Sequence, residues 1–434
     1  MGIVTALASD TRAKVRQPLG RTQAIGWFVV VVGLFTVFGM GVGTGTAPRS
    51  TLTFTPIDVS HGAPWPLGNL TLPTEWTLVL LGAVIIALGA EVLVRCLTKG
   101  AMVRVGLMAI VFLLAVLVWA SRQPGPSQVP FINLTAILVG SAAITMILIY
   151  GSLSGILCER AGVVNIAIEG QFLGGYLVGE MIDSATNNWL LATLGGVVIG
   201  ALMGWLLAFL AIRYLSDQII VGVVIVTMFT GLASYFNSWV LTPYPNLNNG
   251  NIAANLAIPG LMKIPIIGPT FFDETGYFYL MMVLVGLVSF GLFKTRWGLR
   301  VRAVGEHPQA AASVGISVER TRYVNVVLGG AVAGVGGVAF AAIQGQFTPS
   351  ITSGFGYIAL AAMIFGRWRP SGAVAACTLF GVSAYLAYNL QSYQVPISTE
   401  ILLMFPYLIT IAVSAGLVGR VRPPAADGIP YSRE

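Results

Sequence analysis

The fold of this chain is decided by an uncharged run at residues 134–157, which reads LTAILVGSAAITMILIYGSLSGIL. A helix needs roughly 20 apolar residues to cross the hydrocarbon core of a bilayer, and this run is long enough. The whole chain of 434 residues has the same character, because 56% of its residues are hydrophobic and only 9% are charged. Soluble domains carry about 25% charged residues. The sequence therefore excludes a secreted, disordered or soluble nucleic-acid-binding chain, despite the net charge of +7, and predicts an all-α polytopic membrane protein.

Twelve apolar segments are expected to cross the membrane, and an even number places both termini on the same side. Lys and Arg concentrate on the cytoplasmic side of membrane proteins. With the N-terminus in the cytoplasm, 20 of the 23 Lys and Arg residues fall on cytoplasmic stretches, and only Arg49, Arg122 and Lys263 fall outside. We therefore expect cytoplasmic N- and C-termini. The segments are 25–42, 76–94, 105–120, 134–157, 163–181, 189–212, 218–238, 278–293, 323–343, 353–366, 371–390 and 400–419.

Three parts are expected along the chain. Residues 1–130 hold the first three segments and form an N-terminal extension. Residues 131–422 form a core of about ten segments, nine of which are in the list above, and residues 423–434 form a cytoplasmic tail. The longest internal stretch of the core, residues 294–322, is dense in charge. The other cytoplasmic connections are too short to hold a soluble catalytic domain.

The sequence lacks the motifs of an energy-converting enzyme. A phosphate-binding loop of the form G-x-x-x-x-G-K-[ST] requires a glycine before its lysine, and none of Lys14, Lys99, Lys263 and Lys294 follows a glycine. The two histidines, His61 and His307, cannot form an H-E-x-x-H metal site. Acidic residues are sparse within the segments, unlike a proton relay. We expect a conduit with no catalytic residue, metal site or bound cofactor.

The internal stretch 294–322 contains the signals of a short helix. Pro308 suits a first helical position, Glu306 or His307 precedes it, alanines follow, and Gly315 ends it. An isolated helix this short is unstable in water and must pack on something. Its small alanine face fits either a groove on a partner or the chain's own bundle. The candidate coupling residues are Gly305, Glu306, His307, Pro308, Ala310, Ala311 and Gly315.

Two interrupted segments, 151–175 and 344–372, are the candidate substrate path, because transporters often bind substrate at broken helices. If a helix starts near Arg160, Asn165 and Glu169 share one face of it. Glu169 then lies about 13 Å along the axis, near the membrane middle. Either Glu169 accepts hydrogen bonds from substrate, or it braces broken-helix backbone amides or pairs with Gln171. Gln218, Phe355 and Tyr357 are weaker candidates, since such residues often serve interhelical bonding or packing.

Three stretches resemble the nucleoside-permease members of one transporter family, and a fourth resembles the family more broadly. Residues 155–170, GILCERAGVVNIAIEG, are similar to the family signature E-R-[SA]-G-V-V-N-I-G-I-E-G. Residues 264–269 resemble I-P-x-[IL]-G-P, and residues 423–431, PPAADGIPY, resemble the ending P-A-A-L-G-x-P-Y. The stretch 298–317 resembles the coupling loop of permease subunits of ATP-binding-cassette (ABC) importers, in the branched subfamily for ribose-like sugars and nucleosides.

The resemblance implies a permease of the bacterial cytoplasmic membrane that is embedded in lipid and binds no nucleic acid. It implies three kinds of protein partner: ATPase subunits that hold ATP and Mg²⁺, a second permease subunit and an extracytoplasmic substrate-binding lipoprotein. Nucleosides are the expected substrate on resemblance alone, and a simple sugar such as ribose is the alternative. A self-sufficient secondary carrier or channel is the rival from another class, and it predicts coupling-ion residues within the segments.

Overall fold

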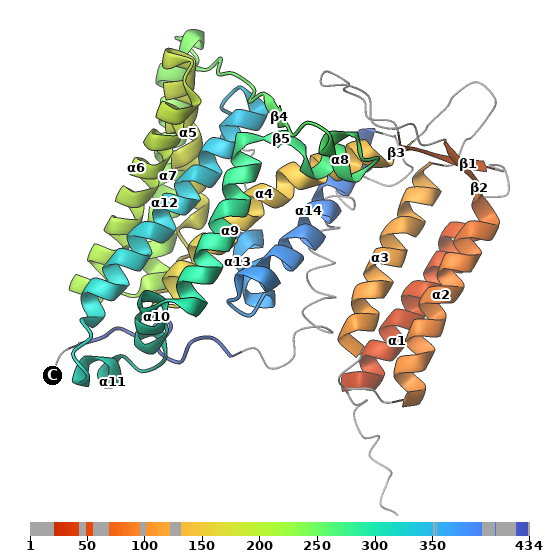
Figure 1. Cartoon of the computed structure of the whole chain (residues 1–434), viewed down its shortest axis with the longest axis horizontal. Coiled ribbons are helices and arrows are strands. Elements are labelled where there is room, and N and C mark those ends of the chain that lie inside the picture. The colour runs from red at the N-terminus through yellow and green to blue at the C-terminus, as the bar shows by residue number, and fades with distance from the viewer. Residues whose placement is uncertain are drawn as a thin grey trace, which may run out of the picture. The chain divides into compact units, whose positions relative to one another are not determined.

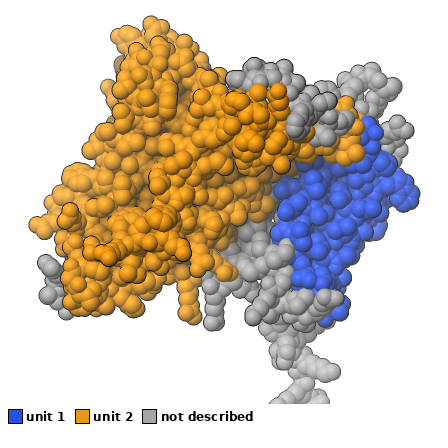
Figure 2. All heavy atoms as spheres, viewed as in Figure 1, with its two compact units in different colours: residues 1–50, 71–129, 415–417 blue, residues 51–70, 130–414, 418–434 orange. Residues whose placement is uncertain are grey.

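The computed structural model describes residues 21–42, 49–54, 69–95, 101–121, 132–349, 352, 354–392, 404 and 422–432. The chain divides into two compact units, which Figure 2 distinguishes by colour. Unit 1 comprises residues 1–50, 71–129 and 415–417, and unit 2 comprises residues 51–70, 130–414 and 418–434. The segment predicted at 400–419 lies outside the described residues except for Met404.

The described residues of unit 1 form three α-helices. They are α1 (Arg21–Leu34), which continues as a π-helix over Phe35–Gly41, α2 (Thr74–Arg95) and α3 (Ala101–Ala120). Helices α1 and α2 approach closely because glycines face each other: a Cβ on Gly89 would lie 2.9 Å from the Val30 nitrogen. Arg104 on α3 forms a bidentate ion pair with Glu91 on α2, with N···O distances of 2.9 and 2.6 Å.

Unit 2 contains long helices that run between two ends of the unit, together with several short helices (Figure 1). The long ones are α4 (Leu134–Glu159), α5 (Ile168–Thr186), α6 (Trp189–Ala208), α7 (Gln218–Phe236), α9 (Gly276–Lys294), α12 (Val318–Gln344) and α14 (Pro370–Ser392). Helices α6 and α7 continue as π-helical turns over Phe209–Arg213 and Asn237–Leu241. The shorter ones are α8 (Ile267–Phe271), α10 (Arg296–Glu306), α11 (Pro308–Ser313) and α13 (Phe355–Phe365).

Within the described residues, eight helices are long and apolar enough to cross a membrane, and α13 and Gly106–Ala120 are shorter apolar helices. The chain is therefore a mainly helical, multi-pass membrane protein. Short strands accompany the helices, which the expectation of an all-α fold did not include. They are β1 (Arg49–Thr53), β2 (Leu70–Pro73), β3 (Ile132–Asn133), β4 (Asn255–Ala257) and β5 (Asp273–Thr275). β1 pairs in parallel with β3, and β4 pairs antiparallel with β5. These strands pair backbone groups of connecting segments that no helix satisfies.

Helix α12 is the central element of unit 2, and glycines allow α5 and α6 to pack directly on its backbone. A Cβ on Gly204 would lie 2.6 Å from the Val326 carbonyl oxygen, and one on Gly200 would lie 2.8 Å from the Gly334 Cα. On the α5 side, a Cβ on Gly337 would lie 2.7 Å from the Tyr176 nitrogen. Small residues at such contacts let transmembrane helices approach until their backbones touch. This packing fixes the start of α5, where the candidate path lies.

Candidate substrate path and coupling surface

The chain breaks between α4 and α5, and the break differs from the helix expected to start near Arg160. Helix α4 ends at Glu159 and α5 begins only at Ile168. Gly162 has a φ of +85°, and a Cβ there would lie 2.9 Å from Arg322 Nη2 and 3.1 Å from the Ala426 oxygen. Only glycine combines this backbone conformation with so little space. The prediction that Asn165 and Glu169 share a helix face, with Glu169 about 13 Å along it, is therefore wrong: Asn165 lies in the break and Glu169 in the first turn of α5.

Three of the candidate polar residues hold this break together. Asn165 Nδ2 donates to Ser154 Oγ at 3.2 Å and to Gln171 Oε1 at 3.1 Å. Gln218 Oε1, at the start of α7, accepts from the Val164 backbone N–H at 2.8 Å. All of these side chains are buried. The Gln218 bond satisfies a backbone N–H that has no helical partner, and the Asn165 bonds join the break to α4 and α5 through side chains.

Glu169 joins the first break to the second one. Its Oε2 accepts a hydrogen bond of 2.7 Å from the Gly356 N–H in the first turn of α13. A Cβ on Gly356 would lie 2.6 Å from the Glu169 nitrogen, so the close approach requires glycine. The turn before α13 also needs glycine, since Gly354 has a φ of +94°. The two interrupted segments predicted from sequence therefore meet, and Glu169 binds a broken-helix amide as the structural alternative predicts.

The two candidate aromatic residues differ in exposure. Phe355 is 8% exposed and packs edge-on against Phe340, with ring centroids 5.2 Å apart. Tyr357, two residues further along α13, is 47% exposed. A buried ring in an edge-to-face pair is a packing residue, whereas an exposed ring can stack on a ligand. Of the pair, only Tyr357 has an exposed ring.

The short helix predicted in the internal stretch is present as α11. Pro308 occupies its first position, His307 precedes it, and Gly315 follows it with a φ of +83°. Ala311 is buried with Val304 and Val318, whereas His307 and Ala310 are exposed. One face of α11 thus rests on its own bundle and the other face is open. α10 precedes it and is amphipathic, with Val301 and Val304 buried among exposed arginines.

Gly305 and Glu306 do not belong to α11 but end α10. A Cβ on Gly305 would lie 3.0 Å from the Arg160 carbonyl carbon, so this glycine brings α10 against the α4–α5 break. Glu306 Oε2 accepts a hydrogen bond from the Ala425 N–H at 3.3 Å. The contact with residue 425 links the coupling region to a part of the chain more than 100 residues later. No local sequence pattern shows such a contact.

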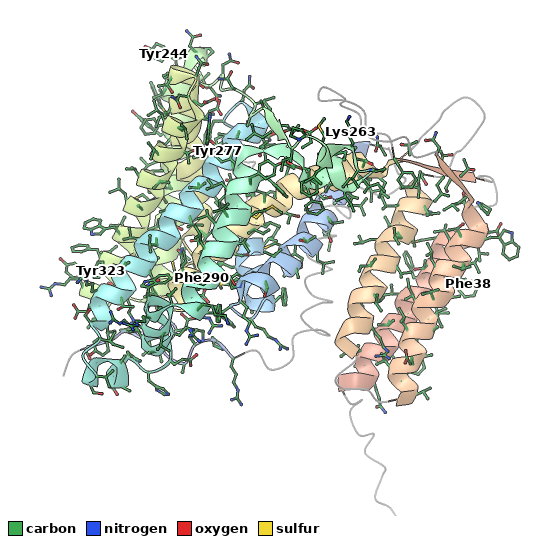
Figure 3. The ribbon with its side chains drawn as sticks, viewed as in Figure 1. Phe38, Tyr244, Lys263, Tyr277, Phe290 and Tyr323 are labelled. Carbon is green, nitrogen blue, oxygen red and sulfur yellow. The ribbon has the colours of Figure 1, made fainter. Side chains whose placement is uncertain are left out.

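A recess at the opposite end of unit 2 contains none of the predicted path residues. Its volume is about 320 Å³, and Asp183, Trp189, Asn251 and Tyr277 are among its lining residues. The rings of Trp189 and Tyr277 meet at 79° with centroids 6.2 Å apart. Figure 3 shows Tyr277 near this end of α9, while Phe290 lies towards the other end. The recess lies beside the ends of α5 and α6, and its lining is mainly apolar, with a few polar and aromatic side chains.

The chain is similar to known permeases over most of unit 2. Residues 137–414 match the family described as "Branched-chain amino acid transport system / permease component". No solved structure matches the chain.

Three named relatives are ABC transporter permeases. The guanosine ABC transporter permease protein NupQ of Bacillus subtilis is 36% identical over 298 residues, which cover 65% of this chain and 92% of the relative. The nucleoside ABC transporter permease protein NupC of Lactococcus lactis is 37% identical over 297 residues, with the same coverage of 65% and 92%. The glucose ABC transporter permease protein TsgB13 of Haloferax volcanii is 28% identical over 296 residues, which cover 63% of this chain and 75% of the relative. The extent of these matches shows that the chain belongs to this family of membrane transport permease components.

Proposed function

We propose that this chain is the transmembrane permease subunit of an ABC importer that carries nucleosides across the cytoplasmic membrane. The substrate class is supported by the two relatives named for guanosine and nucleosides, which are 36% and 37% identical to the chain. In this proposal the chain has twelve membrane segments and cytoplasmic termini. ATP and Mg²⁺ are bound by partner ATPase subunits, and this chain carries out no catalysis. A second permease subunit completes the path, and an extracytoplasmic lipoprotein delivers the substrate.

The observation that carries the proposal is the half-exposed helix α11. Its buried face, at Ala311, connects it to α10 and α12, while His307 and Ala310 are open. Six residues give a helix too short to stand alone, so its place on the bundle is fixed and its free face is available to another protein. A self-sufficient carrier has no need of such a surface.

We propose that the substrate path runs along the junction of the two breaks. The exposed ring of Tyr357 is the stacking surface for a nucleoside base. Asn165, Gln171, Gln218 and Glu169 hold the wall of the path rather than the substrate, since their hydrogen bonds join parts of the backbone and one another.

Substitution of Ala310 tests the coupling role of α11. Ala310→Glu places a carboxylate on the exposed face, and Ala310→Ser is the matched control that keeps the side chain small. We expect the Glu variant to lose co-purification of the ATPase subunit and ATP-dependent uptake, and the Ser variant to keep both. Equal co-purification with both variants would exclude α11 as the ATPase contact.

A competition experiment separates the two substrate classes. Uptake of radiolabelled guanosine is measured in the presence of excess unlabelled adenosine, ribose or glucose. We expect competition by adenosine alone. Glucose is a specific competitor to test because a relative that is 28% identical is named for it. Absence of guanosine uptake, together with uptake of radiolabelled ribose or glucose, would replace nucleosides with simple sugars as the substrate.

A further inference from the structure

The C-terminal segment, residues 422–432, lies beside α10 and α11 (Figure 1). The Ala426 N–H donates to the Gly305 carbonyl at 2.9 Å, and the Ala425 N–H donates to Glu306 Oε2 at 3.3 Å. Tyr431 packs on the small apolar cluster of Val304, Ala311 and Val318, to which α10, α11 and α12 each contribute one residue. The segment thus contacts the coupling region through its backbone and through an aromatic side chain.

The same segment is fixed on its other side to α12. Arg322 is 2% exposed, and its guanidinium donates from Nη1 to the Ile429 carbonyl at 2.9 Å and from Nη2 to the Ala426 carbonyl at 3.5 Å. A buried guanidinium is costly unless its donors are used. Arg322 therefore holds the segment in one position, because its planar group matches two carbonyls at once.

The segment also touches the break between α4 and α5. The Ala426 carbonyl lies 3.1 Å from where a Cβ on Gly162 would be, so the segment and the break are in direct backbone contact. The Asp427 carboxyl lies close to the carboxyl of Glu159, the last residue of α4. Two carboxyl groups this close share a proton or repel.

From Glu159 the contacts continue to α13. Trp368 Nε1 donates to Glu159 Oε2 at 2.5 Å, and Arg160 Nε donates to the Trp368 carbonyl at 3.0 Å. Trp368 lies in the turn that ends α13, and the start of α13 is the turn held by Glu169. A continuous series of packed and hydrogen-bonded groups therefore runs from α11 through the C-terminal segment to both breaks.

We propose that residues 422–431 are a transmission element that couples movement of α10 and α11 to the two breaks, with Arg322 and Tyr431 as its positioning residues. The inference rests on the proposed function, because it names how force from an ATPase partner reaches the substrate path. The short connection between α11 and α12 would pass movement to α12 alone. The glycine contacts of α12 with α5 and α6 hold that helix in place. The C-terminal segment contacts the break at Gly162, in addition to the direct contact of α10 with the break at Gly305.

Two pairs of variants test the proposal in the reconstituted complex. Arg322→Lys removes the guanidinium that donates to the carbonyls of Ala426 and Ile429. Arg320→Lys is its control, since Arg320 is exposed on the same helix. Tyr431→Ala removes the side-chain contact with the α10–α12 cluster, and Ile429→Ala is its control, since Ile429 is 55% exposed. The readout is nucleoside molecules transported per ATP hydrolysed, which a loss of folded protein does not change.

We expect Arg322→Lys and Tyr431→Ala to lower this ratio about tenfold, within the range of coupling free energies between sites, while ATP hydrolysis continues. The controls should keep the wild-type ratio. If transport and hydrolysis fall together, the segment only stabilises the fold and the proposal is wrong. Because Tyr431 is only half-buried, Tyr431→Ala is expected to fold. This variant therefore tests the proposal even if Arg322→Lys does not fold.

A distance measurement separates this inference from the substrate assignment. Spin labels at Gln309→Cys on α11 and Ile364→Cys on α13, two exposed positions outside the proposed path, report whether ATP binding shifts the two elements relative to each other. A shift in the otherwise unchanged protein that Arg322→Lys abolishes supports the transmission element, even if guanosine is not transported. A shift that Arg322→Lys and Arg320→Lys leave intact would overturn it.

Discussion

Replacing Glu169 by alanine should loosen the start of α13. The variant loses the 2.7 Å hydrogen bond that the Gly356 N–H donates to Glu169 Oε2. A hydrogen bond to a charged group contributes about 1.5–3 kcal/mol, and a carboxylate at a helix N-terminus adds about 0.3–1 kcal/mol. We therefore expect Glu169→Ala to lower the free energy of unfolding by about 2–4 kcal/mol. Glu169→Gln keeps one oxygen acceptor and should lose about 1 kcal/mol.

Denaturant unfolding of the purified protein and uptake by the reconstituted complex are the paired assays. The matched control is Glu319→Ala, because Glu319 is exposed in the first turn of α12 and a surface substitution changes stability by about 0.5 kcal/mol or less. We expect Glu169→Gln to keep uptake and Glu169→Ala to lose uptake together with stability. If Glu169→Ala unfolds like the control, Glu169 does not hold α13. If Glu169→Gln stays folded but does not transport, the carboxylate acts on the substrate and the bracing role is refuted.

Two further predictions concern helix packing and the C-terminal segment. Gly200→Ala places a Cβ 2.8 Å from a backbone atom of α12, whereas Gly231 has nothing within 4 Å. We expect Gly200→Ala to lower the free energy of unfolding by about 1–3 kcal/mol and Gly231→Ala to raise it by up to about 1 kcal/mol. Equal thermal unfolding midpoints of the two variants would contradict the close packing of α6 on α12. Burial raises the pKa of the Asp427 carboxyl to about 7, although its interaction with the carboxyl of Glu159 and the charge of Arg322 oppose the shift. The raised pKa favours the protonated, docked segment, whose contribution is complete below about pH 4, the pKa of an unperturbed Asp, and is lost as the pH rises through about 7. Limited proteolysis of the segment should therefore be faster at about pH 8 than at about pH 6, and Asp427→Asn should remove the difference; the same pH dependence in Asp427→Asn would contradict the assignment.

Much of the fold could be predicted because a membrane-spanning helix is visible in the sequence as a long run of apolar residues. The runs at α4, α6 and α12 are long and apolar, and their residues alone decide that they are helical in lipid. The motifs Gly196-x-x-x-Gly200 and Gly330-x-x-x-Gly334 indicate close packing, and the structure places them on the facing surfaces of α6 and α12.

The start of α5 could not be predicted from the same signal. Residues 163–167 are as apolar as a helix but lie in the break, because Gly162 turns the backbone and Asn165 satisfies polar groups from Ser154 and Gln171. Hydropathy does not distinguish an apolar helix from an apolar turn that is buried in protein. Helix α10 was not predicted, since its alternating charged and apolar residues form no long apolar run.

In the region of α10 and α11, the ends of a helix could be predicted from the local sequence, but contacts with distant residues could not. Pro308 and Gly315 mark the ends of α11 because helix termini depend on the residues at those positions. The contacts of Arg322 with Ala426 and Ile429 join residues more than 100 positions apart. The tail motif at 423–431 was visible in the sequence as a resemblance, but its partners were not.

The central claim is that ATP hydrolysis on partner subunits drives nucleosides through this permease. Accumulation of radiolabelled guanosine in proteoliposomes measures it most directly, with this chain reconstituted alone and together with its second permease, ATPase subunits and binding lipoprotein. We predict accumulation only with the full set of subunits and only with ATP. Accumulation by this chain alone, or by the full complex without ATP, would contradict the claim.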